Sequence, residues 1–205
     1  MPTDPKPRRR WFRFSLRSLL VFTVLMGLPL AWIAKERRQS AIEWQIGKQL
    51  EEEGWDVTYE GPFFVKDTTD QGRWRPMARH LLGDRVVFLA GTKQPIKDLS
   101  LLPNLRNLLS VYIPVSQVGD FSPLATLTNL EYLFIGDDQL TDLTPFAKLR
   151  KLKTLTLWRV PATDLTPIAA LEGLESLILL NTSANRSQIE PLQHALPNCK
   201  IVDGR

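Results

Sequence analysis

The sequence predicts an α/β fold in which short repeats stack into an elongated solenoid with about six parallel strands. Three features that recur every 22 residues support this prediction: an aspartate, a proline and a triplet of apolar residues. One repeat cannot bury its own apolar side chains, so neighbouring repeats must stack and share a continuous core. The aspartates are Asp98, Asp120, Asp142 and Asp164, and the prolines are Pro123, Pro145 and Pro167.

The apolar triplet has the spacing L-x-x-L-x-L, which is typical of a leucine-rich repeat. Its second and third members are two residues apart, so they point to one face of a short strand. The side chains that alternate with them point to the opposite, concave face of the solenoid. The four triplets are Leu108/Val111/Ile113, Leu130/Leu133/Ile135, Leu152/Leu155/Leu157 and Leu174/Leu177/Leu179.

Each repeat is expected to return through one or two helical turns on the convex side. Ser122, Thr144 and Thr166 each stand directly before a proline. Ser or Thr at the N-cap followed by Pro at the first helical position is a signal for the start of a helix.

The turn between strand and helix carries the motif apolar-x-Asp-apolar-x-Pro-apolar at residues 118–124 and 140–146. In this motif the chain resembles bacterial leucine-rich repeat proteins of the internalin-like class, and the resemblance covers roughly half of the chain. The next repeat departs from the motif, because Ala162 stands where a large apolar residue is expected. The resemblance implies a binding role but no particular ligand, because a fold alone does not determine function.

The family usually has an asparagine three residues after each strand, where its side chain binds the backbone of the turn. The corresponding residues here are Ser116, Asp138, Val160 and Thr182. Because valine has no polar group in its side chain, the resemblance implies that this ladder of side chains is broken at Val160.

The basic character of the chain is confined to its N-terminus. Residues 1–39 contain nine Lys or Arg and two Asp or Glu, a net charge of +7, so the remainder carries −3 of the overall +4. An acidic repeat domain does not favour binding to nucleic acid. The single cysteine, Cys199, excludes an intrachain disulfide framework.

Residues 18–35 are predicted to form a single transmembrane helix after a basic tail at 1–17. The uncharged run from Ser18 to Ala34 is close to the minimum length of a spanning helix. A cleaved signal peptide and a buried soluble helix are the alternatives, although no small-x-small cleavage site follows the run. The six basic residues before it place the N-terminus in the cytoplasm and the repeat domain on the outer, periplasmic side of the inner membrane.

Residues 36–83 are predicted to form a juxtamembrane helix and a cap on the first repeat, and residues 84–205 the leucine-rich repeat domain. Apolar residues recur at helical spacing in residues 36–53, and they alternate with polar residues at 55–59 as in a half-buried strand. Residues 76–82 are expected to form a short helix. Residues 86–89 stand one period before 108–111, which predicts the first strand of the solenoid. The last repeat is atypical and ends at 196–202.

The column of Asp98, Asp120, Asp142 and Asp164 has two interpretations. Stacked carboxylates could form a ladder for calcium, or each carboxylate could accept backbone N–H groups in its own turn. The second is favoured, because one carboxylate per layer supplies too few oxygens for an ion with six to eight ligands.

The outward strand positions predict an apolar and aromatic patch on the concave face. Exposed patches of this kind mark interaction sites, and Tyr and Trp are favoured anchors of interfaces. A cap segment that covers the patch, or scattered exposed aromatics without a role, are the competing interpretations. The candidate binding residues are Tyr112, Tyr132, Phe134, Thr156, Trp158 and Ile178.

We therefore expect a membrane-anchored binding module for a protein or another component of the cell envelope. No nucleophile, metal-binding, phosphate-binding or dinucleotide-binding motif is present in the sequence, so we expect no enzyme activity and no cofactor. A self-associating structural scaffold is the alternative. An enzyme with active residues in segment 55–83 is a weak third possibility.

Overall fold

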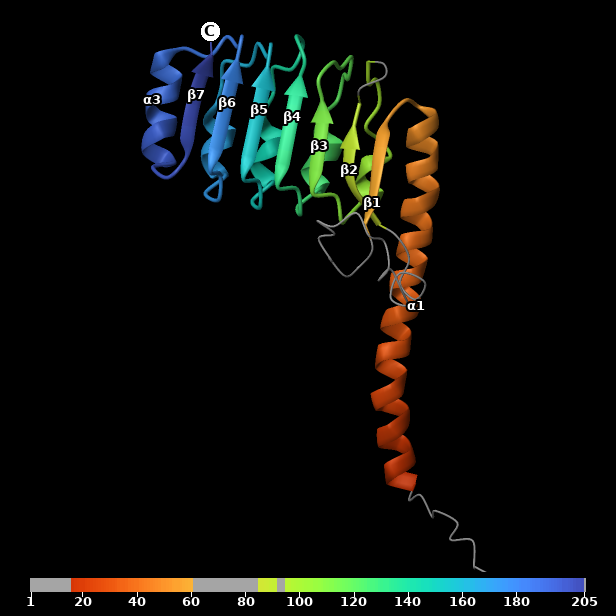
Figure 1. Cartoon of the computed structure of the whole chain (residues 1–205). Coiled ribbons are helices and arrows are strands. Elements are labelled where there is room, and N and C mark those ends of the chain that lie inside the picture. Colours follow the sequence, from red (N-terminus) through yellow and green to blue (C-terminus); the bar gives the residue numbers. More distant parts are fainter. Residues whose placement is uncertain (1–15, 61–84, 92–94, 205) are drawn as a thin grey trace, which may run out of the picture.

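The computed structural model describes residues 16–60, 85–91 and 95–204, and side chains from residue 27 onward within these ranges except those of Glu60 and Arg85. One seven-stranded sheet runs in sequence order from one end of the molecule to the other (Figure 1). Short 3-10 helices lie behind the sheet. The longest helix that the structure describes, α1 (Leu16–Glu52), lies beside the first edge of the sheet with its C-terminal part, and its N-terminal part extends beyond the sheet. The strands are β1 (Asp56–Glu60), β2 (Arg85–Ala90), β3 (Ser110–Ile113), β4 (Tyr132–Gly136), β5 (Thr154–Trp158), β6 (Ser176–Leu180) and β7 (Lys200–Gly204).

The predicted register of the repeats is confirmed. Strands β2 to β7 are all parallel, and β3 to β6 pair residues that are 22 apart, such as Leu133 with Leu155. The second and third members of each apolar triplet are buried, with at most 2% of their surface exposed. β1 adds a seventh strand that runs antiparallel to β2, as the alternation at 55–59 indicated for the cap.

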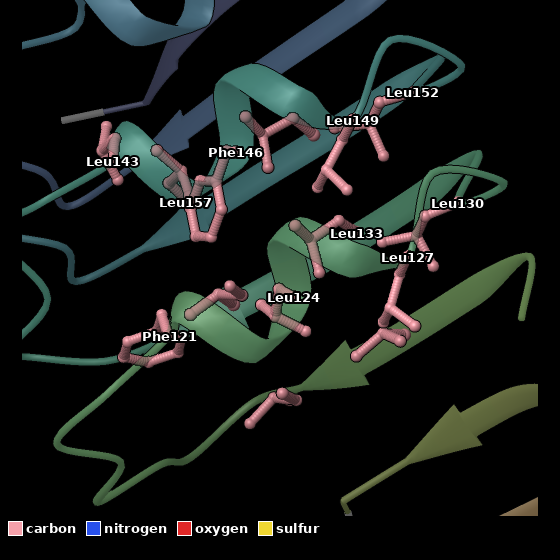
Figure 2. Packing of buried hydrophobic residues seen from close by; sticks show 14 of the residues in the cluster. Phe121, Leu124, Leu127, Leu130, Leu133, Leu143, Phe146, Leu149, Leu152 and Leu157 are labelled. Carbon is pink, nitrogen blue, oxygen red and sulfur yellow. The ribbon is translucent and has the colours of Figure 1, made fainter. Parts of the chain in front are cut away.

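The core lies between the sheet and the 3-10 helices that return behind it. In Figure 2, Phe146 lies next to Leu157 and Leu149 lies next to Leu152, and Leu124 and Leu127 take the equivalent positions one layer away. Phe121 and Phe146 pack edge to face with their ring centroids 6.5 Å apart. The helices are η1 (Leu102–Asn104), η2 (Ser122–Thr126), η3 (Thr144–Lys148) and η4 (Thr166–Ala170).

The starts of these helices differ from the prediction. Ser122, Thr144 and Thr166 are the first residues of the 3-10 helices, and the N-cap positions are taken by Phe121, Leu143 and Leu165, which make no side-chain cap hydrogen bond. The physical reason is that the aspartate two residues earlier already accepts the backbone N–H of the Ser or Thr, which removes the need for a polar N-cap.

The turn after β4 also differs from the prediction. Asp137, not Asp138, points inward, with 2% of its surface exposed. Its Oδ1 accepts the backbone N–H groups of Gln139 at 2.6 Å and Leu140 at 2.9 Å, and its Oδ2 accepts the hydroxyl of Ser116. One repeat later Val160 is buried and cannot continue this ladder, as the sequence implied.

Helix α1 closes the open end of the solenoid next to the first repeat. Leu50 and Trp55 are almost fully buried there and belong to the same core as the repeats. Glu43 of α1 is also buried, and its carboxylate accepts hydrogen bonds from Gln39, from Asn107 and from the backbone N–H of Val86. This carboxylate links the cap to β2 and to the loop before β3.

Burial raises the pKa of Glu43 above its ordinary value, and the three hydrogen bonds oppose this rise only in part. The folded chain therefore binds this proton more tightly than the unfolded chain, so stability rises as the pH falls from neutral through the raised pKa. We expect Glu43→Gln to remove this gain when urea unfolding is compared at about pH 7 and about pH 5. The exposed Glu52→Gln on the same helix serves as the control; a wild type that loses stability relative to Glu43→Gln over this range would contradict the assignment.

The predicted transmembrane helix at 18–35 requires correction. The segment is helical as part of α1, but no helix in the described part of the chain is both long and apolar enough to cross a membrane. The uncharged run from Ser18 to Ala34 ends at Lys35 and is shorter than the roughly 20 apolar residues that a bilayer requires. The location on the periplasmic side of the inner membrane depended on this helix and stays a prediction.

The opposite end of the solenoid closes with helix α3 (Arg186–Ala195) and β7. Asn185 caps α3 by accepting the backbone N–H of Gln188, while the Gln188 side chain accepts the backbone N–H of Asn185. Leu192 and Leu196 are buried against the last repeat, whereas Gln193 and His194 are exposed. The short helix predicted for 76–82 lies outside the described residues.

Candidate binding face on the concave side of the sheet

The outward side chains of the parallel strands align in two long rows across the concave face. The alignment follows from the register, because residues that are 22 apart face each other on neighbouring strands. The row nearer the start of the strands contains Ser110, Tyr132, Thr154, Ser176 and Lys200, and the row beside it contains Tyr112, Phe134, Thr156, Ile178 and Val202.

The aromatic residues gather on β3 and β4. Tyr112 and Phe134 lie side by side, with ring centroids 4.5 Å apart and planes inclined by 38°. Tyr132 is 49% exposed, the largest exposure of any large apolar or aromatic side chain that the structure describes in these two rows. The structure therefore brings three of the six predicted residues to neighbouring outward positions on these two strands.

Thr156 is the least exposed of the six predicted binding residues. It points outward, as predicted, but it is only 8% exposed because it stands between the longer side chains of Phe134 and Ile178 in the same row. A partner would contact the flanking side chains before it reached this threonine.

Trp158 lies one step farther along β5 and packs against Gly136 of β4. A Cβ atom added at Gly136 would lie 2.7 Å from the indole Cε3 and 2.1 Å from the carbonyl oxygen of Pro114. Gly136 therefore leaves the space in which the indole ring lies. The sequence pattern did not identify Gly136 as part of the face, although it is the residue paired with Trp158 at the repeat spacing.

Charged side chains border the concave face at both ends of β5. Before the strand, Lys153 binds Glu131 at 2.6 Å, and the hydrogen bond and charge of that carboxylate raise the pKa of the lysine. After the strand, the Arg159 guanidinium lies 5.8 Å from the centre of the Trp158 ring and 3.8 Å from Asp138. The sequence places Arg159 at the border of the patch but not among the candidate binding residues, and the repeat pattern does not reveal its left-handed backbone (φ 58°).

The aspartates of the 22-residue column lie elsewhere, in the exposed turns before the 3-10 helices. Each accepts the backbone N–H of the residue two positions later, at 2.8–2.9 Å. Hydrogen bonds from these Ser and Thr residues hold the pKa of all four carboxyls below the ordinary value. Within the described residues, no three His, Cys, Asp or Glu side chains are grouped closely enough to hold a metal ion.

No protein-family model matches the sequence, and no curated protein matches it. Among solved structures, internalin C2 from Listeria monocytogenes is 34% identical with a TM-score of 0.51, over 58% of this chain and 51% of that one. Another internalin from Listeria monocytogenes is 29% identical (TM-score 0.49, 54% of this chain and 33% of that one). A leucine-rich repeat protein from Leptospira interrogans is 22% identical (TM-score 0.48, 52% and 28%). The likeness to internalin C2 supports an internalin-like leucine-rich repeat fold. The chain spans about half or less of the length of these three proteins.

Proposed function

We propose, from this internalin-like leucine-rich repeat fold, that the chain is a binding module that captures a protein partner on its concave face. The observation that carries the proposal is the group of aromatic residues Tyr112, Tyr132 and Phe134 on β3 and β4, in which Tyr112 and Phe134 are in ring contact and Tyr132 is half exposed. Its rings lie on the side of the sheet away from the shared core.

Folding alone does not explain why large aromatic groups stand at these positions. Tyr132 leaves about half of its surface in water, whereas its neighbour Leu133 is 2% exposed on the core side. Burial of such groups by a partner is favourable by roughly 25 cal/mol for each Å² of apolar surface that is removed from water. Tyr and Trp are also the residues that most often dominate binding energy at protein interfaces.

The alternative of a scaffold that stacks end to end has less support. The first edge of the sheet is occupied by β1 and α1, and the last repeat is covered by α3, whose exposed residues include Gln193 and His194. Solenoids use such polar or structured caps to prevent open-ended stacking. A monomer in sedimentation of the full chain is the expected result, and a series of growing oligomers would favour the scaffold instead.

The third possibility, an enzyme with active residues in segment 55–83, falls mostly on residues outside the described part of the chain. The described portion of that segment is Trp55, which is buried in the core, and the strand β1. The solved structures that resemble the chain are leucine-rich repeat proteins and add no argument for catalysis.

The proposal predicts that Tyr132→Ala combined with Phe134→Ala weakens capture of the partner by at least about tenfold, which corresponds to about 1.4 kcal/mol. The full chain is immobilised, proteins are collected from an extract of the source cells, and the affinity of the purified captured protein is then measured for each variant. Circular dichroism confirms that the variant is folded.

The matched control is Lys148→Ala combined with Arg150→Ala, two exposed changes at and just after η3 on the convex side. The control is expected to bind as the wild type does. A folded concave-face variant with unchanged affinity, beside a weakened convex-side control, would show that the partner binds elsewhere.

A further inference from the structure

We propose that the partner places an acidic side chain on Arg159, next to the apolar group that covers Trp158. This inference rests on the proposed function and specifies the chemistry of the partner at one end of the concave face. It follows from the backbone conformation of Arg159, from the way Trp158 is held, and from the weakness of the ion pair that Arg159 makes within the chain.

The backbone at Arg159 is unusual for its residue type. Its φ of 58° lies in the left-handed region, which glycine, asparagine and aspartate adopt more readily than other residues. The equivalent position one repeat later is Asn181, with φ 50°, which suits this conformation. The N–H groups of both residues donate to the neighbouring strand, at 2.8 Å for Arg159 and 3.0 Å for Asn181. The turn therefore needs this conformation but does not need an arginine.

The left-handed turn places the guanidinium group of Arg159 beside the face of the Trp158 indole, 5.8 Å from the ring centre. The indole lies against Gly136, where the absence of a Cβ atom leaves room for the ring. Arginine and tryptophan thus form a preorganised pair, which reduces the entropy that a partner would lose in ordering them. A planar guanidinium also matches the two oxygens of a carboxylate.

Within the chain, Arg159 makes only a weak ion pair. Its contact with Asp138 is 3.8 Å long, and the two side chains are 58% and 65% exposed. Exposed pairs of this kind are weak, so a carboxylate of a partner can replace Asp138 without a large loss. Lys153 at the other end of β5 differs, because Glu131 holds it at 2.6 Å. Of the two cations that border β5, Arg159 is therefore the one that is available to an acidic group.

The test uses a random peptide library displayed on phage and selected on the immobilised full chain. We expect the wild type to enrich peptides in which Asp or Glu lies next to an aromatic or large aliphatic residue. Arg159→Asn should bind the enriched peptides about three- to tenfold more weakly, because it keeps a residue suited to the left-handed backbone and removes the charge. Arg159→Glu should select peptides with Lys or Arg in place of the acidic residue. Arg150→Glu, on the convex side, should select the wild-type peptides.

The outcomes separate this inference from the proposed function. Enriched apolar peptides without an acidic preference, bound equally by the wild type and Arg159→Asn, would overturn the inference, while their loss in Tyr132→Ala/Phe134→Ala would still support the concave face. Enriched peptides that are insensitive to both sets of variants would overturn the proposed function as well. If Arg159→Glu does not fold, the comparison with Arg159→Asn decides alone.

Discussion

Leu155→Ala is expected to lower the free energy of unfolding by about 2–5 kcal/mol. Leu155 is fully buried in β5, with Leu133 and Leu177 paired on either side of it in the neighbouring strands. Because repeats on both sides pack against this side chain, the cavity cannot close by the movement of one loop. Urea denaturation followed by circular dichroism measures the change.

Thr156→Ala is the matched control, one residue along the same strand and on the concave face. Its expected cost is about 1 kcal/mol or less, because the side chain is small and lies outside the shared core. Equal losses for the two variants would contradict the assignment of inward and outward positions, which would then be shifted by one residue.

Gly136→Ala is expected to destabilise the chain by about 1–3 kcal/mol and to displace Trp158. The added methyl group would lie 2.1 Å from the carbonyl oxygen of Pro114, which is backbone and cannot rotate away. The tryptophan fluorescence of the folded variant should change, because the Trp158 indole must move away from residue 136 of β4. Binding of a partner that covers Trp158 should weaken at the same time.

Gly119→Ala is the control for the effect of adding a methyl group to glycine. Nothing lies within 4 Å of a Cβ at Gly119, so this variant should be as stable as the wild type or slightly more stable. A stable Gly136→Ala with wild-type fluorescence would show that the indole does not depend on the glycine.

The sequence predicted the parts of the fold that the repeat period determines. Inward residues such as Leu133 and Leu155 recur every 22 residues, and burial of such rows is required wherever repeats stack. The concave positions followed from the same rows, because side chains alternate along a strand. The cap was predictable from local periodicity, since α1 and β1 have helical and alternating patterns of their own.

The repeat period could not predict the turns that follow the strands. Asp138 occupies the expected column, but the chain turns so that Asp137 points inward after β4. After β5 and β6 the backbone instead becomes left-handed, at Arg159 and Asn181. These choices depend on which backbone N–H and C=O groups each turn must satisfy, and the spacing of apolar residues carries no such information. Gly136 was therefore missed as part of the candidate site, and Arg159 was expected only at its border.

The predicted transmembrane helix failed for a different reason. A run of uncharged residues is a statement about local composition, and the structure shows a longer helix, α1, that continues past Lys35 into the cap of the solenoid. Leu50 and Glu43 hold the C-terminal part of α1 against the first repeat. Both residues lie outside 18–35, so the hydropathy of that segment carries no information about this contact.

Hydroxyl-radical footprinting of the full chain, alone and with its captured partner, tests the central claim most directly. Tyr132 on the concave face and Trp44 on α1 are 49% and 51% exposed, so both aromatic rings are open to oxidation in the unbound chain. If the concave face binds the partner, oxidation of Tyr132 falls in the complex while oxidation of Trp44 stays unchanged. Protection of Trp44 with continued oxidation of Tyr132 would contradict the account and place the partner on the helix.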